Sequence, residues 1–198
     1  MHLTPAFDAA LTYAIHIHAF QKRKDTEIPY IAHLLAVSSI VLEHGGTEAE
    51  AIGALLHDAG EDAGGHARVI DIEVRFGAAV AQIVADCTDT YEDPKPSWKP
   101  RKIAYLESIA HKAGSSRLVS CADKLHNARA ILRDHRRIGD EIFKRFSASK
   151  ANTLWYYDEL AHAFLEATPY TTAATELAQE LDRVVTELHA VAQHPRSR

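Results

Sequence analysis

Apolar residues recur at helical spacing along nearly the whole chain, and no stretch alternates apolar and polar residues between hairpin turns. This pattern predicts an all-α fold. Thr4 and Pro5 form an N-cap and first-position pair that begins a helix. The glycines at 45–46 end another, and the three prolines within 93–100 require a loop. The expected helices cover residues 5–20, 31–44, 49 to 58 or 62, 70–76, 78–87, 101–113, 115 or 116 to 133, 149–167 and 172–192.

The length of 198 residues suggests one domain over 1–167, with a C-terminal helix and tail at 168–198 that pack on it or extend it. The 27 acidic against 22 basic residues argue against a general nucleic-acid binder. No apolar run reaches the roughly 20 residues that a membrane span needs, and the first residues lack the layout of a signal peptide. Cys87 and Cys121 match no zinc or redox spacing, which indicates a reducing compartment, and we expect the cytoplasm.

The segment His57-Asp58-Ala59-Gly60-Glu61-Asp62 concentrates chemically active side chains. On a continuous helix, its histidine and three carboxylates would share an arc of about 140° and could face one pocket. Burying three carboxylates beside a histidine without compensation costs several kcal/mol, whereas a divalent cation removes that cost. The alternative is a solvated acidic helix end before a glycine-rich loop.

Two other helices carry isolated polar residues in apolar surroundings. His33 stands in Tyr30-Ile31-Ala32-His33-Leu34-Leu35, and Asp123 follows Leu118-Val119-Ser120-Cys121-Ala122. Taken singly, His33 is typical of a core histidine, and Asp123 of a structural aspartate paired with a nearby cation. Together with His57 and Asp58 they form a set of four nitrogen and oxygen ligands that suits manganese, iron, nickel or zinc.

The order of these residues resembles the HD phosphohydrolase superfamily, whose metal-binding positions match His33, His57-Asp58 and Asp123. A narrower resemblance rests on Arg23-Lys24, on Glu61-Asp62 and on the sequence Ala-Asp-Lys-Leu-His-Asn-Ala-Arg at 122–129. These motifs are similar to the hydrolase domain of RelA/SpoT proteins and to the single-domain small alarmone hydrolases, including the metazoan ones. The resemblance covers residues 4 to 160 and implies a compact multi-helix HD-domain fold with a C-terminal helical extension.

The resemblance implies a manganese-dependent pyrophosphohydrolase that removes the 3′-pyrophosphate from ppGpp or pppGpp and leaves GDP or GTP. The implied metal ligands are His33, His57, Asp58 and Asp123. Glu61 and Asp62 would position or deprotonate the attacking water. Asn127 would contact the nucleotide, and Arg23 and Lys24 would meet its phosphates or its base. Lys99 and Lys102, beside the proline loop, are further candidates for binding an anionic substrate.

Several alternatives stay open at this point. Ala130 stands where the long RelA/SpoT enzymes commonly carry a threonine that helps hold the nucleotide, so adenine alarmones such as pppApp remain candidate substrates, as does 2′-dephosphorylation of NADPH. Another HD nucleotide phosphohydrolase is a further alternative. A non-catalytic nucleotide-binding module is disfavoured because every ligand and both carboxylates are present. The aromatic run 155–157 (Trp, Tyr, Tyr) either lines the site or belongs to the core.

The remaining expectations concern histidines and self-association. His16, His18, His126 and His135 lack motif support and are expected to be packing or surface residues. The helix at 172–192 is expected to be an accessory cap or a surface for a homo-oligomer, and the sequence does not separate the two.

Overall fold

The computed structural model describes residues 2–92, 94–167 and 171–193, and these residues contain helices and no strand beyond one isolated bridge between Lys22 and Pro29. The all-α prediction is confirmed. The elements are α1 (Pro5–Ile17), α2 (Ile31–Glu43), α3 (Glu48–Leu56), α4 (Ala59–Asp62), α5 (Gly65–Phe76), α6 (Ala78–Cys87), α7 (Trp98–Ile109), α8 (Gly114–Ile138), the 3-10 helix η1 (Gly139–Arg145), α9 (Lys150–Glu166) and α10 (Thr172–Gln193).

The most consequential difference from the sequence prediction is a break in the third helix. We expected one helix to continue from residue 49 to Asp58 or Asp62. Instead α3 ends at Leu56, His57 is its C-cap, and Asp58 is the N-cap of the short helix α4. The single continuous arc predicted for the four active side chains is therefore wrong. His57 and Asp58 lie in the corner between two helices.

Other helix boundaries also differ from the predicted ranges. The first helix ends at Ile17, three residues early, and leaves the basic segment after it in an irregular loop. Trp98 begins α7 with Pro100 inside its first turn, so the proline loop is shorter than predicted. Ala113 is the N-cap of α8, while Ser116 instead donates a hydrogen bond to Asp86 (2.6 Å). The 3-10 helix η1 and the early start of α5 at Gly65 were not predicted.

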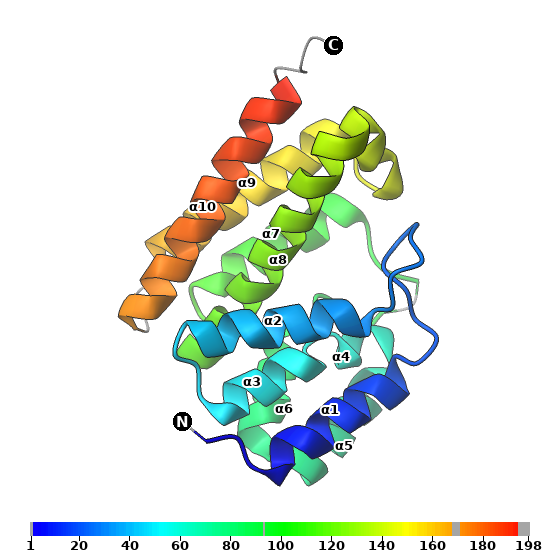
Figure 1. Cartoon of the computed structure of the whole chain (residues 1–198), viewed down its shortest axis with the longest axis vertical. Coiled ribbons are helices and arrows are strands. Elements are labelled where there is room, and N and C mark those ends of the chain that lie inside the picture. Colours follow the sequence, from blue (N-terminus) through cyan, green and yellow to red (C-terminus); the bar gives the residue numbers. More distant parts are fainter. Residues whose placement is uncertain (1, 93, 168–170, 194–198) are drawn as a thin grey trace.

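Two hydrophobic clusters meet at the α2–α3 pair. The larger joins these helices to α6, α8, α9 and α10, and the smaller joins them to α1, α5 and α6. Along α2, Leu34 belongs to the smaller cluster and Val37 to the larger. Along α3, Leu55 belongs to the smaller cluster and Ala54 to the larger. In Figure 1, α2 and α3 lie between the N-terminal helices and the α8–α10 layer. This pair is consequently held from both sides.

The C-terminal helix α10 lies along α8 and α9 (Figure 1). Its apolar residues Leu177, Leu181, Val185 and Leu188 are buried in the larger cluster. Burial of this apolar stripe is what an amphipathic helix packed on a helical layer requires.

None of the helices in the described residues combines the length and the apolar character required to cross a membrane.

Candidate active site

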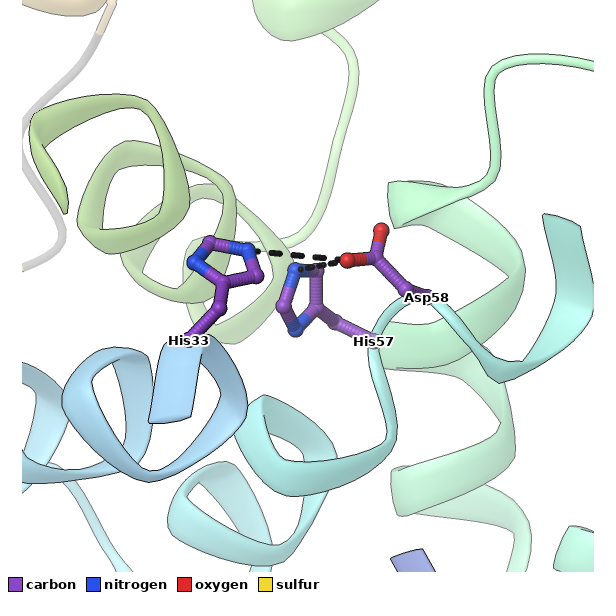
Figure 2. Close-up of side chains that lie close together, drawn as sticks. All are labelled: His33, His57 and Asp58. Carbon is purple, nitrogen blue, oxygen red and sulfur yellow. Dashed lines mark ion pairs between the residues drawn. The ribbon is translucent and has the colours of Figure 1, made fainter. Parts of the chain in front are cut away.

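The helix break places His57 and Asp58 opposite His33, the third residue of α2. Ligand atoms of these three residues all lie within 4.8 Å of one another. Asp58 Oδ2 is 3.0 Å from His57 Nε2 and 3.5 Å from His33 Nε2. Figure 2 shows both rings directed at this carboxylate. Both imidazoles are almost fully buried, so the cluster is enclosed by the protein on the histidine side.

Asp123 joins this cluster from the middle of α8. Its Oδ1 is 3.1 Å from His33 Nε2 and 3.6 Å from His57 Nε2. All four residues predicted as metal ligands therefore lie together, although they come from three separate parts of the chain. The two nitrogens and two carboxylates are donors of the type that divalent transition metals prefer.

Hydrogen bonding orients both histidines toward the centre of the cluster. His57 Nδ1 donates to the carbonyl of Ala54 (2.8 Å), which leaves Nε2 as the ring nitrogen that faces the carboxylates. Among the residues that the structure describes, this buried Nε2 has no hydrogen-bond partner. A buried ring nitrogen aimed between two carboxylates is an arrangement that a bound cation would satisfy.

The charges of the cluster point the same way. Burial opposes ionisation of Asp58, but the neighbouring His57 and His33 hold its pKa well below the ordinary value. Burial likewise opposes ionisation of Asp123, whose pKa is held well below the ordinary value by Lys124 and the same two histidines. Burial also opposes the charged form of His57, yet the two carboxylates raise its pKa well above the usual range. The cluster therefore attracts positive charge, and these residues fit a divalent metal ion.

Two residues that were not predicted to belong to the site contact the ligands directly, and one of them, His126, was expected to be a packing or surface residue. Tyr30 donates its hydroxyl hydrogen to Asp58 Oδ2 (2.6 Å). A hydrogen bond joins the Nδ1 atoms of His126 and His33, which lie 2.7 Å apart. Burial together with His33 and Arg23 lowers the pKa of His126 to about 4. His126 thus supports a ligand. Its position three residues after Asp123 on one helix was the signal available.

The two carboxylates after Asp58 have different surroundings. Asp62 accepts a hydrogen bond from Gln21 Nε2 (2.9 Å), and burial together with the Asp58 charge raises its pKa. Glu61 instead pairs with Lys95 Nζ (2.7 Å) and receives the backbone N–H of Asp89 (3.3 Å). Asp62 faces the cavity described next, whereas Glu61 holds the segment that precedes α7.

A cavity of about 440 Å³ adjoins the cluster. Asp62, Tyr30 and Asn127 form its wall on the side of the cluster, and Asn127 donates to Asp123 Oδ1 (2.5 Å). Positive charge surrounds much of the remaining wall. The basic residues that line it are Lys22, Arg23, Lys24, Lys102, Lys124, Arg133 and Arg145.

Most of the residues predicted to bind substrate line this cavity: Arg23, Lys24, Asn127 and Lys102. Lys99 lies elsewhere, with Nζ 4.9 Å from the centre of the Trp155 ring. The aromatic run divides, because Tyr156 and Tyr157 line the cavity while Trp155 packs against Trp98. Ala130 is also part of the wall.

Lys124 was not predicted as a site residue. It follows Asp123 directly, pairs with its Oδ2 (2.6 Å) and reaches the cavity wall. Burial opposes its charge, but Asp123 raises the pKa of Lys124 well above its ordinary value. The cavity therefore holds a permanent positive charge next to the ligand cluster.

Known proteins resemble this chain in both sequence and fold. The HD domain family model matches residues 10–154. The guanosine-3′,5′-bis(diphosphate) 3′-pyrophosphohydrolase MESH1 of Xenopus tropicalis is 39% identical over 127 residues, which cover 63% of this chain and 68% of that protein. Its Mus musculus counterpart is 36% identical over the same shares.

A solved structure, described as a metazoan ortholog of SpoT that hydrolyzes ppGpp and plays a role in starvation responses, superposes with a TM-score of 0.75. It is 25% identical to this chain, and the match covers 94% of this chain and 97% of that one. The family match spans α2 to α8, the helices that carry His33, His57, Asp58 and Asp123. The chain belongs to the HD domain family.

Proposed function

We propose that this protein is a 3′-pyrophosphohydrolase of ppGpp and pppGpp, yielding pyrophosphate and GDP or GTP. The observation that carries the proposal is the junction of the ligand cluster with a basic cavity large enough for a nucleotide. The MESH1 relatives bear the name of the same activity.

His33, His57, Asp58 and Asp123 would hold one divalent ion, and we propose manganese. When bound, such an ion lowers the pKa of water and neutralises charge on a phosphoryl group. The protein contributes the enclosed geometry, because hydrogen bonds from Tyr30 and Asn127 and the contact with His126 orient the ligands.

Asp62 is the residue best placed to accept a proton from the attacking water. Its raised pKa, caused by burial and by the charge of Asp58, makes it a stronger base than an ordinary aspartate. The new bond joins the water oxygen to the phosphorus attached to the 3′-oxygen, and the bond from that phosphorus to the 3′-oxygen breaks. The products are pyrophosphate and a free 3′-hydroxyl. Glu61, tied to Lys95, would position the loop over the site rather than take the proton.

The cavity wall supplies the means to bind a highly anionic substrate in a protein of net charge −5. Arg23, Lys24, Lys102 and Lys124 would meet the phosphates, and Tyr156 and Tyr157 would contact the base or ribose.

Ala130 favours a second candidate substrate class. It lines the cavity with a methyl group in place of a hydroxyl. A wall without that hydrogen-bonding group has less means of selecting guanine, so adenine alarmones such as pppApp would also fit.

A product assay tests the proposal. The protein would be incubated with manganese and, separately, ppGpp, pppApp and NADPH, and the nucleotide and phosphate products would be resolved. Pyrophosphate with GDP supports the proposal, and pyrophosphate with ATP extends it to adenine. Orthophosphate from NADPH alone would assign a different reaction to the same cluster. Asp58→Ala is the inactive control, and Asp158→Ala, an exposed aspartate on α9, is the matched active one.

A further inference from the structure

His18 is a buried histidine that no step of the proposed reaction uses. It is the C-cap of α1, and its side chain is 3% exposed. Its Nδ1 lies 2.5 Å from Oε1 of Gln21. Its other ring nitrogen, Nε2, is buried with no hydrogen-bond partner among the described residues. Burying an imidazole nitrogen without a partner lowers the stability of the fold. The histidine at this position therefore needs an explanation other than stability.

The contact with Gln21 supplies one. A glutamine amide has an acceptor end and a donor end, and the two ends of Gln21 face different partners. Oε1 faces His18, and Nε2 donates to Asp62 Oδ2 at 2.9 Å. His18 can satisfy Oε1 only by carrying its proton on Nδ1. That proton fixes the amide with its NH₂ group toward Asp62.

The backbone of Gln21 is held as well. Its N–H donates to the carbonyl of His18 (3.0 Å), and its own carbonyl accepts from the N–H of Tyr30 (2.9 Å). The second anchor lies beside the site, because the Tyr30 hydroxyl also donates to Asp58. Although the backbone N–H and carbonyl of Gln21 are both fixed, its side-chain amide can still rotate. The hydrogen bond with His18 prevents that rotation.

We propose that His18 and Gln21 are positioning residues that act in series on Asp62. The proposal rests on the proposed role of Asp62 as proton acceptor. Gln21 engages one carboxylate oxygen, Oδ2, and so presents the other oxygen to the attacking water. His18 keeps the amide from turning its carbonyl toward the carboxylate, which would repel it. The pair therefore acts on turnover through Asp62, while Gln21 also forms part of the cavity wall.

The test uses His18→Leu, Gln21→Met and the double variant, each loaded with manganese and assayed with ppGpp. We expect His18→Leu to lower kcat about 10-fold, with KM and metal content unchanged. The released Gln21 amide no longer holds the charged Asp62, and a hydrogen bond to a charged group is worth about this much. Gln21→Met should lower kcat similarly. The double variant should be no slower than Gln21→Met alone, because both changes interrupt one series.

Stability and rescue separate this role from a merely structural one. Leucine removes the unpartnered nitrogen, so the Tm of His18→Leu should equal or exceed that of the wild type while kcat falls. His18→Asn places an amide N–H near the position of Nδ1 and should restore most of the lost kcat. His16→Leu, an exposed histidine two residues earlier, is the control and should match the wild type.

Each alternative outcome overturns a distinct statement. If Asp62→Asn keeps wild-type kcat, the proposed proton acceptor is wrong and the positioning role falls with it. If Asp62→Asn is inactive while His18→Leu and Gln21→Met keep wild-type kcat, only the positioning role is wrong. A loss confined to KM would make Gln21 a substrate-binding residue. A fall in Tm together with kcat, without rescue by asparagine, would make His18 structural.

Discussion

Arg23 and Asn127 are 104 positions apart in the sequence, yet Arg23 Nη2 donates to Asn127 Oδ1 at 2.6 Å. The other end of the same amide donates to Asp123 Oδ1 at 2.5 Å. A single side chain thus links the basic loop after α1 to the ligand cluster. This link defines one side of the cavity and makes Arg23 part of the wall rather than a mobile surface charge.

Arg23→Ala should raise KM for ppGpp more than it lowers kcat. The guanidinium supplies positive charge to the cavity wall, and a hydrogen bond to a charged group contributes roughly 1.5–3 kcal/mol, so we expect KM to rise at least 10-fold. Steady-state kinetics would measure both constants. Lys144→Ala, an exposed residue paired with Glu141, is the control. A larger loss in kcat than in KM would place Arg23 in transition-state stabilisation.

Asp58→Ala should abolish stoichiometric metal binding together with activity. Asp58 is one of the two carboxylates shared by His33 and His57, so its removal leaves Asp123 as the remaining carboxylate among the four proposed ligands. Metal content after dialysis against manganese, measured by elemental analysis, would check the expectation. A variant that retains a full equivalent of metal would show that Asp58 is not a ligand.

Removal of the metal should lower thermal stability. Without a cation, the charged Asp58 and Asp123 repel one another in a buried cluster, and a ligand that binds only the folded state stabilises it. We expect the Tm to fall on chelation and to return when manganese is restored. Asp58→Ala should show no response to either treatment, and an equal Tm for the metal-free and metal-loaded wild type would contradict the prediction.

Asp62→Asn should lower kcat much more than Glu61→Gln does. The first removes the proposed proton acceptor and should lower kcat by about 10²- to 10⁴-fold with the metal retained. The second removes a partner of Lys95 and should have a smaller effect. The reverse order would assign the proton transfer to Glu61.

The value of kcat/KM should fall as pH rises above about 7. Burial, followed by the charges of Lys124 and Arg101, lowers the pKa of Lys102 to about 7. Lys102 is therefore charged below that pH and neutral above it, and the anionic substrate loses one attractive charge as the pH increases. The acidic groups that face it are Glu61, Asp123 and Asp89. Lys102→Met should have a low kcat/KM that no longer depends on pH in this range, whereas a wild-type profile would exclude Lys102.

Much of the helical pattern could be predicted from periodicity and capping, and so could the identity of the clustered residues. His33 and Asp123 stood out because each is a polar residue in an apolar helix, and the structure places both beside His57. The corner at His57-Asp58 could not be predicted, because residues 55–62 contain no proline and the only glycine lies beyond the break. Tertiary packing of α3 and α4 overrides local propensity there.

The missed contacts have a common physical cause. Gln21 and Tyr30 reach Asp62 and Asp58 only because the loop after α1 folds back over α4. Helical periodicity carries no information about such a loop. His126 and Lys124, in contrast, lie on the same helix as Asp123. His126 was not predicted as a site residue because isolated histidines were assumed to be packing residues.

The division of the ligands between the two halves of the chain has a consequence for biosynthesis. His33, His57 and Asp58 have all been synthesised long before Asp123, which lies on a helix that packs against α2 and α3. A nascent chain therefore holds an incomplete cluster of two histidines and one carboxylate until α8 has left the ribosome. The full set of four ligands is thus present only in chains that have extended through α8.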